Sequence, residues 1–488
     1  MEKHVAMIDA RRPGSPRKEA MIAWIDRIAD SRDAWRQKNH YFNAEHERYL
    51  QFLIPSGLRV LDIGCGTGHL LAGLKPGRGV GVDFSSRMVE IARENYPDLE
   101  FIQGDAEDPE LAARLGGPFD VIVVSDTIGY FDDCETALRN LHSLCTPDTR
   151  IVIAYYSKYW EPILSVAELF GLKMRQPPLN WLSTSDIGNL LSLADFDIIK
   201  RDWRQLVPRR LFGIGPVINR FIGTLPLIRR FSLRNYMVAR PMPTQSLGPL
   251  SVTVIIPCRN ERGNIEPAIR RMPRFAEDME ILFVEGHSSD GTFAECERVR
   301  DAYAGEWDIK AVRQEGKGKG DAMRKGYDLA RGDVLMILDS DLTMPPEDLP
   351  KFYHALVSGK GEFINGSRLV YPMESEAMRF LNWVANQIFS LLFSWLLNQR
   401  FTDTLCGTKV LRRRHYDAIA ANRDYFGDFD PFGDFDLIFG ATKLNLKVAE
   451  IPIRYASRRY GETQISRFSH GWLLVRMVVF AFFRLKAF

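Results

Sequence analysis

Two aspartates, Asp339 and Asp341, stand one residue apart at the end of the apolar run GDVLMIL. Such a run is typical of a buried β-strand, so both carboxylates are expected at the carboxyl end of that strand. Carboxylate oxygens are the ligands that hard divalent cations such as Mg²⁺ or Mn²⁺ prefer. A cation held there can offset the charge that builds up on a departing diphosphate. The pair therefore predicts chemistry that breaks a sugar–phosphate bond.

Further polar residues follow other apolar runs of the C-terminal half. The run LSVTVIIPCRNE contains Pro257, Arg259 and Glu261, and the run MEILFVE ends in Glu285. Between these runs and the paired aspartates lies EGKGKGDAMRKGYDLA, a glycine- and lysine-rich stretch that contains Asp321 and leads into a predicted helix.

The N-terminal half carries a glycine-rich turn. In RVLDIGCGTGH an apolar strand with Asp62 runs into three glycines at positions 64, 66 and 68. Glycine is needed where the backbone turns tightly and approaches a ligand closely. Asp83 ends the next strand, where a carboxylate can accept two hydrogen bonds from a ribose diol. Strands alternate with helices at this spacing, which predicts an α/β fold with an open, doubly wound parallel sheet and its ligand at the carboxyl ends.

Together, DIGCGTG, Asp83, GDA and VVSDTIGYF resemble the successive motifs of class I S-adenosylmethionine-dependent methyltransferases over about residues 35–200. The resemblance implies a Rossmann-like fold and S-adenosylmethionine as cofactor. The implied cofactor-binding residues are Gly64, Gly66 and Gly68 near the methionine moiety, Asp83 at the ribose, Asp105 and Ala106 at the adenine, and also Asp62 and Ser125. Two alternatives stay open, an NAD site and a domain that binds the cofactor without catalysis, and the motifs do not name a methyl acceptor.

In the C-terminal half, IPCRNE, VEGHSSDGT and LDSD resemble, in this order, family 2 glycosyltransferases with a GT-A fold over about residues 251–469. The resemblance implies a nucleotide-sugar pocket and a metal site at Asp339 and Asp341. The implied nucleotide-sugar-binding residues are Pro257, Arg259, Glu261, Glu285, Asp321 and Asp339. Glu285–Gly286 stands where the family often has two aspartates, which leaves the choice between a GDP-hexose and a UDP-hexose open.

Further on, INGSRLV, DTLCGTKVLRR and AEIPIRYASRRYGET resemble the dolichyl-phosphate mannosyltransferase and polyprenyl-phosphate hexose synthase branch. The resemblance implies a polyprenyl phosphate acceptor, with Arg368, Arg458 and Arg459 as catalytic candidates. Positive side chains suit this acceptor, because a lipid phosphate is already anionic and needs clamping rather than deprotonation. The alternative is a soluble or protein acceptor, with the N-terminal half serving as a non-catalytic S-adenosylmethionine-binding scaffold.

We therefore expect a methyltransferase-like domain over residues 1–205, a basic amphipathic extension and linker over 206–248, a glycosyltransferase domain over 249–470, and an amphipathic segment over 471–488. From Lys200 to Arg240 there are ten Lys or Arg residues and one acidic residue. This composition fits either an amphipathic helix on an anionic membrane surface or the last element of the methyltransferase domain.

Two apolar segments, FLNWVANQIFSLLFSWLLN and HGWLLVRMVVFAFFRLKAF, are too polar for conventional spanning helices and predict helices that lie on a membrane surface. The first twenty residues contain no apolar run, so no secretory signal is expected, and six scattered cysteines fit a reducing compartment. We expect a cytoplasmic protein peripheral to the cytoplasmic membrane face. No nucleic-acid-binding module accompanies the basic residues, and the oligomeric state stays open.

Overall fold

The structure, a computed structural model, describes residues 15–177, 179–243, 246–370, 380–423, 433–456, 458, 460 and 467–487. Within residues 380–386 and 467–473 only the backbone is described. The chain divides into two compact units, Met1–Met242 (unit 1) and Pro243–Phe488 (unit 2). The expected domain boundaries stay predictions.

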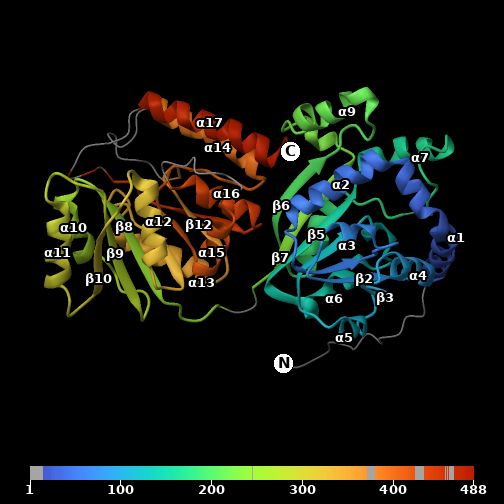
Figure 1. Cartoon of the computed structure of the whole chain (residues 1–488), viewed down its shortest axis with the longest axis horizontal. Helices are drawn as coiled ribbons and strands as arrows, with labels where there is room; N and C mark the ends of the chain where they lie inside the picture. The colour runs from blue at the N-terminus through green and yellow to red at the C-terminus, as the bar shows by residue number, and fades with distance from the viewer. Residues whose placement is uncertain are drawn as a thin grey trace, which may run out of the picture. The chain divides into compact units, whose positions relative to one another are not determined.

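Unit 1 is built on a seven-stranded sheet with the order β3-β2-β1-β4-β5-β7-β6 (Figure 1). The first five strands in this order are parallel, and β7 is antiparallel to both β5 and β6. The strand order reverses between β1 and β4, so a crevice is expected at the carboxyl ends of these two strands. The strands are β1 (Arg59–Ile63), β2 (Arg78–Asp83), β3 (Glu100–Gln103), β4 (Phe119–Ser125), β5 (Cys145–Tyr156), β6 (Phe196–Arg204) and β7 (Arg234–Pro241).

Helices cover the sheet of unit 1, and its central strands β1 and β4 are mostly apolar and buried, as expected for strands covered on both faces. Leu138 of α6 and Leu191 of α8 pack with Ile122 and Ile153 in one core, and Met21 and Ile25 of α1 pack against Met88 of α4. The helices are α1 (Pro16–Lys38), α2 (His40–Leu53), α3 (His69–Gly73), α4 (Ser86–Asn95), α5 (Leu111–Leu115), α6 (Cys134–Asn140), α7 (Glu161–Leu169), α8 (Thr184–Leu193) and α9 (Ile214–Val217).

The basic segment from Lys200 to Arg240 was expected to be either an amphipathic helix or the last element of the methyltransferase domain. It is not a single amphipathic helix. Its two ends lie in β6 and β7, and β7 pairs with β5 inside the sheet. Arg234 and Arg240 are nearly inaccessible to solvent and pair with Asp126 and Asp197. The residues between these strands form short helical turns that include α9.

Unit 2 also contains a seven-stranded sheet, with the order β10-β9-β8-β11-β13-β12-β14. The first four strands in this order are parallel, β13 is antiparallel to β11 and β12, and β14 is parallel to β12. The α/β fold class expected from the sequence is therefore confirmed for both halves. The strands are β8 (Val252–Cys258), β9 (Met279–Glu285), β10 (Asp308–Arg313), β11 (Val334–Ile337), β12 (Phe363–Ser367), β13 (Lys409–Arg412) and β14 (Val448–Pro452).

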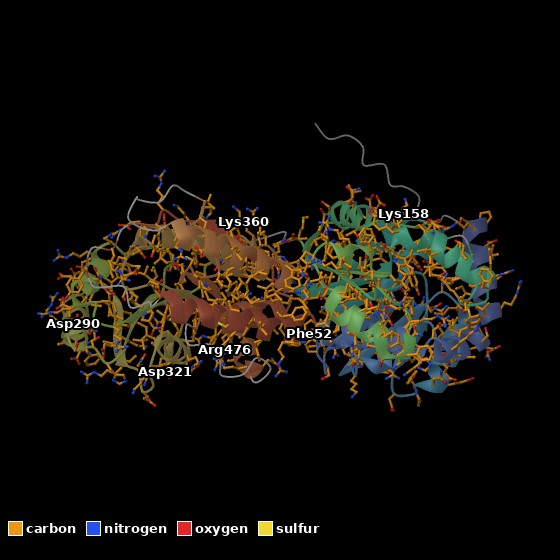
Figure 2. All side chains as sticks on the ribbon, turned by 90° about the horizontal axis from the view of Figure 1, so that it is seen from above. Phe52, Lys158, Asp290, Asp321, Lys360 and Arg476 are labelled. Atoms are coloured by element: carbon orange, nitrogen blue, oxygen red, sulfur yellow. The ribbon has the colours of Figure 1, made fainter. Side chains whose placement is uncertain are left out.

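Two long helices, α14 (Phe380–Leu397) and α17 (Arg467–Leu485), occupy the segments expected to be amphipathic. They pack against each other, with the rings of Trp395 and Phe482 5.7 Å apart. Figures 1 and 2 show α17 along the outside of unit 2, where Arg476 is exposed. Among the described helices, none combines the length and the hydropathy needed to cross a bilayer. The other helices of unit 2 are α10 (Arg262–Arg270), α11 (Thr292–Ala302), α12 (Lys319–Leu329), α13 (Leu349–Val357), α15 (Arg413–Ala421) and α16 (Phe435–Lys443).

Candidate functional site

The paired aspartates of unit 2 lie in the loop that follows β11, and each contacts a cation from another segment. The Lys319 ammonium, at the first residue of α12, lies 2.7 Å from Asp339 Oδ1. Arg458 donates to Asp341 Oδ2 at 2.6 Å. Burial disfavours the charge on Asp339, but Lys319 outweighs that effect and holds the pKa of the carboxyl below its usual range. The Asp339 carboxylate is therefore kept ionised.

Arg458 also joins the aspartate loop to the predicted nucleotide-sugar pocket. Its second nitrogen lies 3.2 Å from Glu261 Oε1, while Asn264 donates to Glu261 Oε2 at 2.6 Å. Glu261 and Asp341, 80 residues apart in the chain by their numbers, thus share one guanidinium. Arg459, the neighbouring candidate, lies outside the described residues.

The remaining predicted pocket residues follow the neighbouring strands. Pro257 lies in β8 and Arg259 directly after it, while Glu285 ends the adjacent strand β9. Asp321 Oδ2 accepts a hydrogen bond from Gly316 N–H at 2.9 Å and so closes the glycine-rich loop ahead of α12. His287 contacts the carbonyl of Gly316 at 3.1 Å, which ties that loop to the end of β9. The structure thus brings these loops to one edge of the sheet.

Arg368 is engaged in a buried ion pair. It donates to both oxygens of Asp403, at 2.6 and 2.8 Å, and its backbone N–H donates to the same carboxylate at 3.0 Å. Burial opposes the charge on Asp403, but Arg368 lowers the pKa of this carboxyl below its usual value. The predicted contact of Arg368 with an acceptor phosphate stays a prediction.

Glycine at position 407 is required by the aspartate loop. A Cβ placed on Gly407 would lie 2.0 Å from Asp339 Oδ2, so any side chain there would displace the carboxylate. The aspartate pair fits a divalent cation by its donor set, because two carboxylates follow one strand and each lies next to a cationic side chain. Sequence reasoning missed Lys319, although the run GKGKG signalled a cation close to this helix start.

The glycine-rich turn of unit 1 has the expected conformation. Gly64, Gly66 and Gly68 have positive φ angles of 76°, 54° and 82°, which glycine adopts without strain. Asp83 Oδ2 accepts from Gly66 N–H at 2.9 Å, which links the ends of β1 and β2. A Cβ on Gly64 would lie 2.1 Å from Thr127 Oγ1, whereas one on Gly66 would meet nothing within 4 Å. The turn is therefore packed on one side and open at Gly66.

Asp62 lies under this turn with both carboxylate oxygens buried and without a hydrogen-bond partner among the described residues. Burial, followed by the charge of Asp83, raises the pKa of Asp62 to about 7. An orphaned carboxylate is costly unless a ligand supplies a cation or donors. S-adenosylmethionine carries a sulfonium and an ammonium group, so the residues present fit this cofactor.

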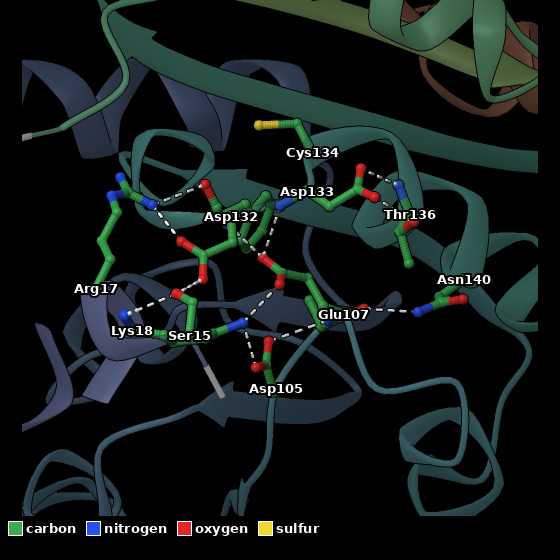
Figure 3. Close-up of polar contacts among 12 residues, drawn as sticks. Ser15, Arg17, Lys18, Asp105, Glu107, Asp132, Asp133, Cys134, Thr136 and Asn140 are labelled. Carbon is green, nitrogen blue, oxygen red and sulfur yellow. Dashed lines mark hydrogen bonds and ion pairs between the residues drawn. The ribbon is translucent and has the colours of Figure 1, made fainter. Parts of the chain in front are cut away.

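Asp105, the predicted adenine contact, is covered by the N-terminal helix α1. Figure 3 shows the Lys18 ammonium between the carboxylates of Asp105 and Glu107. Glu107 in turn accepts from the backbone N–H of Asp132 at 2.6 Å, which fastens the loop after β3 to the loop after β4. Ala106 between them is buried. Sequence reasoning missed Lys18, because nothing near this lysine in the chain marks its contact with residues almost ninety positions away.

Ser125, at the end of β4, belongs to a buried polar network rather than to the glycine turn itself. Its Oγ lies 2.8 Å from His46 Nε2, and His46 Nδ1 lies 2.8 Å from the Tyr236 hydroxyl. Burial holds the pKa of His46 well below its usual value, so the imidazole is neutral at pH 7. The next residue, Asp126, has a φ of 56° and forms an ion pair with buried Arg234 at 2.8 Å. These groups lie at or near the carboxyl end of β4, one of the two strands between which the strand order reverses.

Comparison with known proteins places two families along the chain. Residues 34–201 match the family model described as "Methyltransferase domain", and residues 253–427 match "Glycosyl transferase family 2". Among solved structures, a SAM-dependent methyltransferase from Thermotoga maritima is 19% identical, aligns with 45% of this chain and 99% of its own, and has a TM-score of 0.36.

Two curated proteins are each similar to a little under half of the chain. Glycosyltransferase AglD of Haloferax volcanii is 26% identical over 46% of this chain and 36% of its own length. A dolichol-phosphate mannosyltransferase of Pyrococcus furiosus is 28% identical over 44% of this chain and 59% of its own length. The chain thus spans less than two thirds of the length of these relatives. By its two family matches, the chain resembles a methyltransferase domain over residues 34–201 and a family 2 glycosyltransferase over residues 253–427.

Proposed function

We propose that unit 2 transfers a hexose from a nucleotide sugar, a GDP-hexose or a UDP-hexose, to a polyprenyl phosphate with inversion at the anomeric carbon. The observation that carries this proposal is the pairing of Asp339 and Asp341 with Lys319 and Arg458. The two carboxylates around this loop can bind a metal ion, and the two cations can bind the oxygens of a diphosphate. The similarity to a dolichol-phosphate mannosyltransferase supports the lipid acceptor.

Asp339 and Asp341 would hold a Mg²⁺ or Mn²⁺ ion, which when bound supplies positive charge to the leaving diphosphate. An oxygen of the acceptor phosphate attacks the anomeric carbon while the bond from that carbon to the diphosphate breaks. The acceptor oxygen is already anionic, so no side chain has to remove a proton. Lys319 and Arg458 lie next to the carboxylates, where released charge on the diphosphate can be bound by their cationic groups.

We also propose that unit 1 binds S-adenosylmethionine and transfers its methyl group to an acceptor of the same pathway. Asp62, Gly66 and Asp83 support cofactor binding through an orphaned carboxylate, an open backbone turn and an acceptor for ribose hydroxyls. The rival is a unit that binds the cofactor without catalysis and serves as a scaffold for sugar transfer. Turnover of S-adenosylmethionine by the full chain separates the two.

The proposed setting is the cytoplasmic face of a membrane, to which the protein is peripheral. On α14 and α17 one side packs into unit 2, as Phe393 and Met477 do. The opposite side exposes Leu391, Val479 and Phe483 to solvent, beside exposed Arg476 and Arg484. Apolar side chains flanked by arginines suit an anionic lipid surface.

The test of the acceptor is partition of radiolabelled sugar into organic solvent, with a panel of GDP- and UDP-hexoses and a polyprenyl phosphate. We expect label in the lipid phase with one donor, and none with the variant Asp341→Asn. If label stays in the aqueous phase with every donor while a soluble acceptor is glycosylated, the lipid assignment is wrong.

A further inference from the structure

Unit 1 exposes several large apolar side chains to solvent on two segments of the chain. Ile163 and Val166 lie one helical turn apart on α7, Phe170 follows directly after this helix, and each of the three is more than half exposed. In the segment between β6 and β7, Phe212 is fully exposed and Leu227 is 77% exposed. Monomeric proteins rarely expose contiguous apolar surface of this kind unless it contacts a partner. We call these residues, together with Val217, the apolar face of unit 1.

The two segments of this face are connected to each other. The indole N–H of Trp160, just before α7, donates to the carbonyl of Phe231 at 2.7 Å. The rings of Tyr159 and Phe231 lie 6.4 Å apart. Figure 1 shows α7 and α9 along the same edge of unit 1, and Lys158 next to α7 is labelled in Figure 2. These contacts join the end of the segment between β6 and β7 to the residues that precede α7.

This surface is held in place from behind by polar contacts. Asn219 bonds both the N–H and the carbonyl of Val207 at 2.8 Å, and it donates to the Tyr41 hydroxyl at 3.0 Å. Arg229 stacks over the Trp203 ring and lies 3.8 Å from Asp202. The polar side chains of this segment thus bind to the rest of unit 1, whereas several of its apolar side chains face the solvent.

The backbone supports the same conclusion. Leu211 and Phe212 both have positive φ angles, 42° and 53°, which bulky L-residues rarely adopt. Phe212 is fully exposed to solvent, so burial of its ring does not offset the cost of this backbone conformation. Strain of this kind persists where a partner uses the side chain.

The charge around the face selects one kind of partner. Arg209, Arg210, Arg220 and Arg230 are all exposed in the same segment. No acidic residue occurs from Trp203 to Pro241, and Glu168 of α7 forms an ion pair with Lys173. Exposed apolar side chains beside exposed arginines complement a bilayer surface. The apolar side chains can insert among the acyl chains, and the arginines can bind the anionic headgroups.

We propose that the apolar face of unit 1 docks on an anionic lipid membrane, through Phe212, Leu227 and the exposed side of α7. This inference deepens the proposed function, because it gives the methyltransferase unit its own membrane contact rather than leaving it tethered through unit 2. A methyltransferase held at the interface acts on acceptors presented there, which fits a polar group carried on a lipid.

The test uses the full chain with vesicles of phosphatidylcholine and phosphatidylglycerol, and with vesicles of phosphatidylcholine alone. We expect binding to the mixed vesicles to exceed binding to the neutral ones, and hydrogen–deuterium exchange to slow in residues 159–172 and 209–231 on binding. The variant Phe212→Ser/Leu227→Ser should weaken vesicle binding about tenfold. Its matched control, Leu193→Ser/Leu329→Ser, removes two leucines that are about half exposed elsewhere and should bind as the parent does.

Exchange in residues 159–172 and 209–231 that is unchanged by vesicles would overturn the proposal, even if α17 holds the chain on the membrane. Absence of vesicle binding would overturn it as well. Protection of the same segments on concentrating the protein without lipid, with a dimer in sedimentation velocity, would assign the face to a second copy. None of these outcomes depends on sugar transfer, so failure here is distinguishable from failure of the proposed glycosyltransferase activity.

Discussion

The Lys319 ammonium lies 2.7 Å from Asp339 Oδ1. Lys319 therefore already neutralises part of the negative charge that a divalent cation would neutralise. Asp339 and Asp434 raise the pKa of Lys319 above its usual value although burial lowers it, so the lysine stays cationic. A metal ion and Lys319 therefore repel each other when both are near Asp339. This relationship makes the lysine the first residue to test.

Replacing Lys319 with methionine keeps much of the side-chain volume and removes the charge. We expect Mn²⁺ affinity to rise about tenfold, the equivalent of about 1.4 kcal/mol of lost repulsion, while sugar transfer falls. Titration of free Mn²⁺ by electron paramagnetic resonance measures the affinity. The control is Lys351→Met, which removes an exposed lysine of α13 and should change neither quantity. Equal or weaker Mn²⁺ binding in the Lys319 variant would contradict this interpretation.

Asp341→Ala should abolish sugar transfer and leave S-adenosylmethionine binding unchanged, because the two sites lie on different sheets. Loss of this carboxylate removes a metal ligand and leaves Arg458 without one of its partners. Asp301→Ala, at an exposed position of α11, serves as the control. Normal transfer by the Asp341 variant, or by the parent in excess chelator, would rule out the metal assignment.

Asp83→Ala should weaken S-adenosylmethionine binding by about 1.5–3 kcal/mol, the usual contribution of hydrogen bonds to a charged group. The variant also loses the acceptor that holds Gly66 N–H at 2.9 Å. Calorimetry measures the affinity, with Asp98→Ala, an exposed acidic residue of the same unit, as the control. Equal affinity in the Asp83 variant and the parent would remove Asp83 from the cofactor site.

Cofactor affinity should depend on pH through Asp62. Because burial raises the pKa of this carboxyl to about 7, the free protein holds a proton there at pH 6 and loses it by pH 8. A cationic ligand binds the ionised form, so affinity should fall as pH drops below about 7, by at most tenfold per unit. Calorimetry at pH 6 in buffers of different ionisation enthalpy should detect proton release on binding. The Asp62→Asn variant should show a flat profile, and a parent profile that is equally flat would refute the assignment.

Arg368→Ala should lower the free energy of unfolding by about 3–5 kcal/mol, because it leaves the Asp403 carboxylate buried without its partner. Arg368→Lys keeps the charge but not the two-pronged contact, so it should destabilise less. Urea unfolding measures the stability of both variants. In the sugar-transfer assay, we expect the rate of transfer to fall far more in Arg368→Lys than the affinity for the nucleotide sugar. A variant Arg368→Ala as stable as the parent would show that the ion pair contributes little.

Much of each site follows from local sequence. The turn at Gly64–Gly68 follows from the sequence because glycine adopts positive φ angles without strain, and the two aspartates follow because an apolar run places them at a strand end. The order of motifs along the chain also predicted two α/β sheets, since strands that alternate with helices pair in parallel. These features depend on neighbours in sequence and on the period of the hydrophobic pattern.

Other contacts were decided only in the tertiary structure. Lys18 with Asp105, and Arg458 with Asp341, join residues that are about 90 and 117 positions apart, and neither lysine nor arginine shows in sequence which carboxylate it will meet. The insertion of β7 between β5 and β6 likewise turned expected surface arginines, such as Arg234, into buried partners. A charged side chain is encoded by its residue type, but its partner is selected by how sheets and helices bury it. The sequence of this protein therefore determined which reactive groups its two halves carry. The tertiary structure decided which charged side chains pair with those groups.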